Sequence, residues 1–108
     1  MTQAINDHAR AISRDKIAEF CRHWKITEFA LFGSVLRDDF RPDSDIDVLV
    51  SFAPDASWRF YDLISMKEEL AAMFGRPVDL VEKRLIESSE NYIRRNHILN
   101  HMETIYVA

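Results

Sequence analysis

The chain has 108 residues, and 47% of them are hydrophobic, which is enough for one ordinary core and too few for two domains. We therefore expect a single domain over residues 1–108. The formal net charge of -4 excludes the overall basic field of a protein that binds nucleic acid nonspecifically, so no direct nucleic-acid binding is expected. No apolar run approaches the roughly 18 residues of a membrane span, and the single cysteine cannot form an internal disulfide. Together these features predict a cytoplasmic protein.

The first predicted element is an amphipathic helix over residues 9–24. Its apolar stripe repeats at the spacing of one helix face and consists of Ile17, Phe20, Cys21 and Trp24. Because Cys21 lies on this stripe, we expect it to pack in the core and not to act as a nucleophile. A short apolar run at 29–32 then predicts a buried strand that ends at Gly33, and residues 34–39 are expected to form a brief helix.

The central predicted strand covers residues 45–52, a β-branched run that ends before Pro54. A helix over 58–74 follows, with Gly75 as its C-terminal stop, and residues 78–81 form the next predicted strand. The order strand, helix, strand predicts that the two strands run parallel and lie close together.

The last part of the chain is expected to be helical over 86–101 and extended over 104–107. Taken together, the elements predict an α/β (α+β) fold in which helices flank a small mixed sheet of three or more strands.

Two acids share one face of the central strand. Because side chains alternate along a strand, Asp45 and Asp47 point the same way, while Ile46, Val48 and Val50 point into the core. Two carboxylates roughly 6.5 Å apart repel by roughly 2.5 kcal/mol at an effective dielectric of about 20, and a divalent cation would reverse this repulsion. Oxygen ligands of this kind suit Mg²⁺ first and Mn²⁺ second. The spacing alone is also compatible with two solvated acids on an exposed sheet face.

A third acid, Asp79, lies mid-strand between Val78 and Leu80, where an unpaired Asp has poor β-propensity. Its strand is expected beside the central one, so acids from two strands converge. This convergence favours a metal site over solvated surface acids.

The turn upstream of the acids can meet a phosphate. Gly33 permits close approach, and the backbone N–H groups that follow it are free to donate. Ser34 adds a hydroxyl donor, and Arg37 can place its guanidinium near a triphosphate. Gly-Ser after a strand is also found in ordinary turns, so the weight of this signal comes from its place just before the acidic strand.

The order of these residues resembles the nucleotidyltransferase signature of the polymerase β superfamily, and especially its small MNT-type members. The matching stretches are Phe32-Gly33-Ser34-Val35-Leu36-Arg37, Ser44-Asp45-Ile46-Asp47-Val48-Leu49-Val50 and Gly75-Arg76-Pro77-Val78-Asp79-Leu80-Val81. The resemblance implies a polymerase β-like nucleotidyltransferase core. One departure is Asp38, where many members carry glycine, which leaves the conformation of that turn open.

Carried over residue by residue, the resemblance implies two sets of site residues. The catalytic and metal-binding set, which would hold two Mg²⁺ ions or Mn²⁺, is Asp45, Asp47 and Asp79. The nucleotide-binding set, which would grip the triphosphate of ATP, is Gly33, Ser34, Arg37 and Ser44.

Small proteins of this subgroup resemble antitoxins encoded beside a HEPN-domain toxin, some of which are inactivated when AMP is attached to a tyrosine. The resemblance implies metal-dependent transfer of AMP from ATP to a tyrosine hydroxyl of such a toxin, within a hetero-oligomer that supplies the acceptor surface. Two alternatives stay open. One is an antitoxin that neutralises its partner by binding alone, and the other is the catalytic subunit of a two-component enzyme that modifies a small molecule such as an aminoglycoside.

A calcium loop fits the acids less well. Asp43, Asp45 and Asp47 mimic its first ligands, but Val48 and Pro54 stand where the loop needs glycine and glutamate.

The last predicted helix carries two further pairs of polar residues. His97 and His101 stand four apart, but Ile98 occupies the place where a zinc protease needs glutamate, so we interpret them as a surface pair. Arg94 and Arg95 are interpreted as a solvated helix face, with an acidic partner surface as the alternative.

Overall fold

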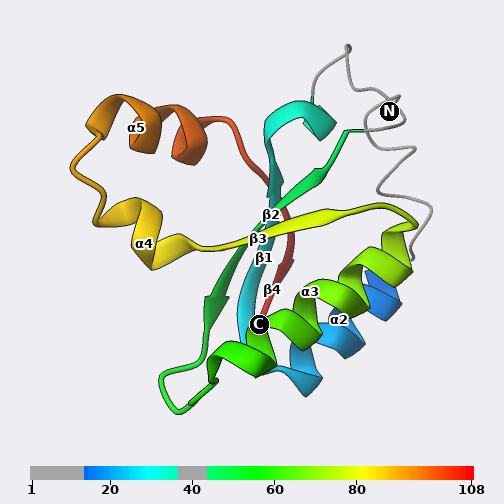
Figure 1. Cartoon of the computed structure of the whole chain (residues 1–108). Coiled ribbons are helices and arrows are strands. Elements are labelled where there is room, and N and C mark those ends of the chain that lie inside the picture. Colours follow the sequence, from blue (N-terminus) through cyan, green and yellow to red (C-terminus); the bar gives the residue numbers. More distant parts are fainter. Residues whose placement is uncertain (1–13, 37–43) are drawn as a thin grey trace.

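The computed structural model describes residues 14–36 and 44–108, and its centre is a four-stranded sheet in the order β3-β2-β1-β4 (Figure 1). The strands are β1 Ile26–Phe32, β2 Ile46–Phe52, β3 Val78–Glu82 and β4 Glu103–Val107. β2 and β3 run parallel, whereas β1 is antiparallel to both β2 and β4. The expectation of a small mixed sheet flanked by helices is confirmed.

The crossover helix α3 Phe60–Phe74 connects β2 to β3 and accounts for the predicted parallel pair. At its start the backbone N–H of Arg59 donates to Asp62 Oδ2 over 2.9 Å, which caps the first turn. At its end Gly75 adopts a left-handed φ of 73° and donates its N–H to the carbonyl of Ala71. The predicted glycine stop is therefore confirmed.

One face of the sheet is covered by α3 and by α2 Arg14–His23, which lie together on one side of the strands in Figure 1. The part of the predicted first helix over residues 9–13 lies outside the described residues. Trp24 Nε1 donates to Glu69 Oε1 over 3.0 Å and so joins the end of α2 to α3. The main core lies beneath these helices and includes Ile17, Phe20, Cys21, Phe29, Leu31, Ile46, Val48, Val50, Met66, Leu70 and Val78.

The opposite face is covered by two short helices, α4 Lys83–Glu87 and α5 Tyr92–Asn100, seen on the other side of the strands in Figure 1. They pack on a second, smaller cluster that consists of Ala30, Phe32, Leu49, Ile86 and Ile98. Because strand side chains alternate, this face also receives the odd-numbered residues of β2 and β3.

The prediction of one helix over 86–101 was wrong in its continuity, because α4 and α5 are separated by a break at residues 88–91. Asn91 Oδ1 accepts a hydrogen bond from the backbone N–H of Arg94 over 3.2 Å, and Ser89 Oγ accepts one from the N–H of Asn91 over 3.2 Å. Short polar side chains that bind the local backbone compete with helix formation in this way, and they start a new helix instead.

Two smaller differences concern β1 and the segment after it. β1 begins at Ile26, three residues earlier than predicted, after Lys25 turns the chain with a φ of 56°. Its polar start is held by β2, since the hydroxyl of Thr27 donates to the carbonyl of Ser51 over 3.3 Å. The expected brief helix is a 3-10 turn over Gly33–Leu36, and the rest of that prediction lies outside the described residues. In residues 14–36 and 44–108, every helix is too short or too polar to cross a membrane.

Candidate active site

Asp47 and Asp79 are paired in register on the neighbouring parallel strands β2 and β3. Neighbouring strands lie about 4.8 Å apart, so the two carboxylates start from adjacent points of the sheet. Both occupy odd-numbered positions and therefore share the face that α4 and α5 cover. Asp47 is half-buried and Asp79 is exposed. The predicted meeting of acids from two strands is thus realised for this pair.

Gly33 lies directly against Asp47. Phe32, the residue before the glycine, is the register partner of Asp47 in the antiparallel pair of β1 and β2. A Cβ atom added at position 33 would overlap Asp47 Oδ2. Gly33 also has a φ of 77°, a conformation that L side chains rarely adopt. Its lack of a side chain thus serves both the turn and the room that the carboxylate needs.

The other predicted site residues are placed less closely together. Asp45 directly precedes β2 and is exposed, and the described lining of the pocket at Asp47 does not include it. The carbonyl of Ser44 accepts a hydrogen bond from Arg76 Nη1 over 3.3 Å. For Ser34 only the backbone is described, as part of the 3-10 turn, and Arg37 lies outside the described residues. Among the residues that the structure describes, no three acid, histidine or cysteine side chains form a group that could hold a metal ion.

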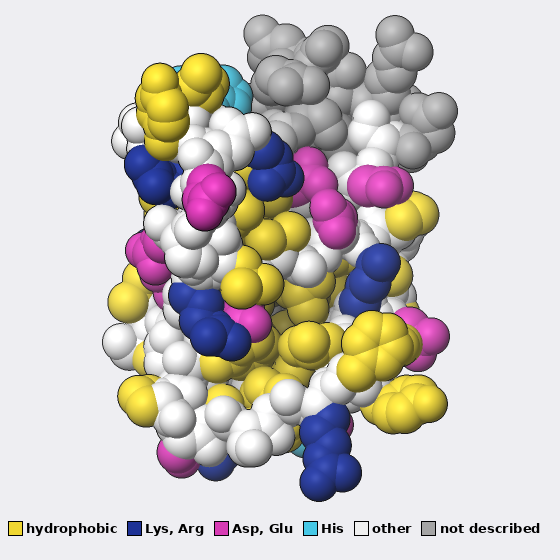
Figure 2. Space-filling view, turned by 60° about the vertical axis from the view of Figure 1, so that its left-hand side comes forward, with side chains coloured by type: hydrophobic (Ala, Val, Ile, Leu, Met, Phe, Trp, Pro, Cys, Tyr) yellow, Lys and Arg dark blue, Asp and Glu magenta, His cyan; other side chains and the backbone are white. Residues whose placement is uncertain are grey.

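A pocket of about 580 Å³ opens at the Asp47–Asp79 pair, which is within the size range of nucleotide and drug sites. On the sheet side it is lined by Phe32, Gly33, Leu36, Asp47 and Asp79, and on the helix side by Arg94, His97, Ile98 and His101. Figure 2 shows acidic side chains gathered toward one end of this side of the molecule, with basic side chains near them.

The sequence reasoning missed the helix side of this pocket. Arg94, His97, Ile98 and His101 follow the i, i+3, i+4, i+7 spacing of one helix face, which indicates in the sequence that they share a face but not that this face meets the acids. Ile98 is 6% exposed and fixes this face against the sheet. The histidine pair is exposed, as predicted, with the two rings stacked 4.5 Å apart, but it also forms part of the pocket wall.

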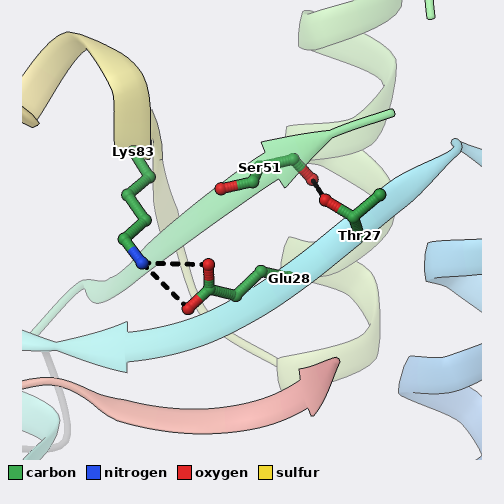
Figure 3. Close-up of polar contacts among 4 residues, drawn as sticks. All are labelled: Thr27, Glu28, Ser51 and Lys83. Atoms are coloured by element: carbon green, nitrogen blue, oxygen red, sulfur yellow. Dashed lines mark hydrogen bonds and ion pairs between the residues drawn. The ribbon is translucent and has the colours of Figure 1, made fainter. Parts of the chain in front are cut away.

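α4 is attached to the middle of the sheet by an ion pair. Lys83 Nζ donates to both carboxylate oxygens of Glu28, over 3.0 and 3.1 Å, and Figure 3 shows the lysine reaching from the start of α4 to β1. Both side chains are largely shielded from solvent, so the pair is less screened than an exposed one. This contact helps to hold the two short helices over the face that carries the acids.

A protein-family model described as a nucleotidyltransferase domain matches residues 14–102. The chain belongs to the nucleotidyltransferase family. This nucleotidyltransferase is 36% identical over 70 residues to the protein adenylyltransferase MntA of Thermococcus cleftensis, an alignment that covers 65% of this chain and 69% of that protein.

Solved structures of similar fold agree with this assignment. A chain provisionally assigned as a minimal nucleotidyltransferase has a TM-score of 0.65 at 27% identity, with 94% of each chain covered. A structure of a tri-AMPylated Shewanella oneidensis HEPN toxin in complex with an MNT antitoxin has a TM-score of 0.62 at 20% identity, covering 94% of this chain and 73% of that chain. At that identity the second likeness concerns the fold of the nucleotidyltransferase alone.

Proposed function

We propose that this nucleotidyltransferase transfers AMP from ATP to a tyrosine hydroxyl of a HEPN toxin and thereby acts as its antitoxin. The observation that carries the proposal is the in-register pair Asp47–Asp79, with Gly33 packed against Asp47, in a pocket of about 580 Å³. The choice of acceptor is supported by the relative named as a protein adenylyltransferase and by the structural neighbour that contains an AMPylated HEPN toxin.

The donor set at this pocket fits Mg²⁺, with Mn²⁺ as the second choice. Mg²⁺ in phosphoryl-transfer sites is held by one or two carboxylates together with water and substrate phosphates, and needs no complete cage of protein ligands. Asp47 and Asp79 supply such carboxylates from one sheet face, whereas Asp45 directly precedes β2 and is exposed. Asp47 and Asp79 would hold the two ions together with water and substrate phosphates, and Asp45 is the further carboxylate that the family resemblance implies. The chemistry of the ions is to neutralise the phosphates and stabilise the leaving pyrophosphate.

The residues of the chain itself bind the triphosphate, orient the tyrosine hydroxyl and accept its proton. The N–H groups of the turn at Gly33 and Ser34 face the triphosphate, and Arg37 and Ser44 complete its binding. Gly33 leaves room for the Asp47 carboxylate at one fixed place. Asp79 orients the tyrosine hydroxyl and accepts its proton as the oxygen attacks the α-phosphorus in line. One P–O bond forms to the tyrosine, the bond to pyrophosphate breaks, and AMP becomes attached to the partner.

The test is to replace Asp47 by Asn, which keeps the shape and removes the charge. We expect Asp47→Asn to lower transfer of labelled AMP from ATP to the co-purified HEPN partner by at least about 100-fold, a loss typical of removing one essential charged group from a catalytic site. The matched control is Asp55→Asn, an equal change at an exposed residue whose contact is an ion pair with Lys25 over 3.2 Å. Transfer is followed by intact mass of the partner.

Three results would contradict the proposal in different ways. Undiminished transfer by Asp47→Asn would remove the acid pair from the mechanism. A triple Asp→Ala variant at positions 45, 47 and 79 that still protects cells from the toxin would indicate neutralisation by binding alone. A partner that gains no mass, while a small hydroxylated compound does, would indicate a two-component small-molecule enzyme.

A further inference from the structure

Two consecutive arginines of α5 have different surroundings. Arg95 is half-buried, and its Nη1 donates to the carbonyl of Ser89 over 3.1 Å, which ties α5 to the break before it. Arg94 is exposed and lines the pocket at the acids. Its backbone N–H is fixed by the cap at Asn91. In residues 14–36 and 44–108, the guanidinium of Arg94 has no hydrogen bond or ion pair.

Arg94 and Asp79 line the same pocket, but in the described part of the chain they form no ion pair with each other. Opposite charges that share a pocket without meeting leave a gap between them. The pocket volume of about 580 Å³ is enough for a ligand to fill that gap. A guanidinium in this position presents a fork of N–H donors to whatever enters opposite the carboxylates.

We propose that Arg94 binds the terminal phosphates of the nucleoside triphosphate. The inference rests on the proposed function, in which the acids on β2 and β3 would hold the metal ions that neutralise the α-phosphate at the sheet side of the pocket. The β- and γ-phosphates then extend toward the helix side, where Arg94 supplies positive charge across from the acids. Arginine matches phosphate oxygens bidentately, so the contact orients the leaving pyrophosphate as well as attracting it.

Nucleotide binding without turnover tests this assignment directly. The titrants are a non-hydrolysable ATP analogue, AMP and tripolyphosphate, each with Mg²⁺, and affinity is measured by isothermal titration calorimetry. We expect Arg94→Ala and Arg94→Gln to weaken binding of the analogue and of tripolyphosphate about tenfold and to leave the affinity for AMP unchanged. A tenfold loss is the lower end of the range for a hydrogen bond to a charged group, as suits a solvent-accessible position. Arg94→Lys should recover part of the loss, because it restores the charge without the fork.

The matched control is Arg22→Ala, which removes the same charge from an exposed position of α2 on the other side of the sheet. Its affinities should equal those of the unchanged chain. Circular dichroism shows whether each variant is folded, and because Arg94 is exposed, all three of its variants should be.

Each remaining outcome overturns the inference. If Arg94→Ala and Arg94→Gln bind the analogue as tightly as the unchanged chain, Arg94 does not contact the phosphates. If the Arg94 variants lose affinity for AMP as much as for the analogue, the contact lies elsewhere on the nucleotide. If the unchanged chain binds none of the three compounds, the proposed function fails together with this inference. The two failures are distinguishable, because a chain that shows the expected Arg94 effects on binding but transfers no AMP to the partner supports this inference and contradicts the proposed acceptor.

Discussion

The two glycines of the chain have nearly the same backbone conformation and opposite surroundings. Gly33 has a φ of 77° and Gly75 a φ of 73°. A Cβ at Gly33 would overlap Asp47 Oδ2, whereas a Cβ at Gly75 would meet nothing within 4 Å. Comparing a substitution at Gly33 with the same substitution at Gly75 therefore separates the cost of a left-handed backbone from the cost of displacing Asp47.

We predict that Gly33→Ala and Gly75→Ala each lower the free energy of unfolding by about 1–2 kcal/mol, the cost of a left-handed L residue. Only Gly33→Ala should also abolish nucleotide transfer, because the flexible Asp47 carboxylate must swing aside to admit the methyl group. Urea unfolding and labelled AMP transfer measure the two effects. Equal activity of the two variants would show that the position of the carboxylate is not critical.

Asp47 and Asp79 could be predicted from the sequence because strand alternation and the strand-helix-strand connection follow from the order and spacing of residues along the chain. They place Asp47 and Asp79 on one face of neighbouring strands before any coordinates are known. The contribution of Arg94 could not be predicted in this way. Its role depends on where α5 docks, which is decided by the burial of Ile98 against the second face of the sheet.

At the scale of elements, α5 depends on its first turn. Asn91 caps the helix by accepting a hydrogen bond from the N–H of Arg94, so the residue that is held by the cap is the one that faces the pocket. The sequence predicted one helix over residues 86–101, but the structure divides it at residues 88–91. The physical reason is that Ser89 and Asn91 compete for the local backbone hydrogen bonds.

We predict that Asn91→Ala lowers the free energy of unfolding by about 1 kcal/mol, the usual cost of losing an N-cap. It should also weaken binding of the ATP analogue a few-fold, because the first turn that carries Arg94 loosens. Asn91→Ser is the control, since serine keeps a cap acceptor and should retain most of both properties. If alanine and serine at this position behave alike in urea unfolding and calorimetry, the cap does not order the turn.

At the scale of the whole molecule, burial of Cys21 in the main core makes the stability of the fold depend on pH. Its side chain is fully buried on the inner face of α2, and burial raises the pKa of the thiol from 9.0 to about 12. Below pH 9 the thiol is protonated in both the folded and the unfolded chain, so stability is unaffected. Between pH 9 and pH 12 the unfolded thiol ionises while the folded one stays protonated, and this difference favours unfolding.

We predict that the unfolding free energy falls through this range with a contribution from Cys21 that approaches about 1.4 kcal/mol per pH unit. Cys21→Ala should have a shallower alkaline slope than the unchanged chain, whatever its absolute stability, since it lacks the ionising group. Urea unfolding at a series of alkaline pH values compares the slopes. Parallel curves would show that the thiol is not shielded in the folded protein.

The pairing of β2 with β3 links ligand binding to folding. Asp47 and Asp79 come from stretches of chain that α3 separates, and they become neighbours only when β3 has been laid alongside β2. Neither half of the sequence holds the pair alone. A nucleotide bound in the pocket at this pair would therefore link two strands that are distant in the chain, and its binding free energy would add to the stability of the folded protein.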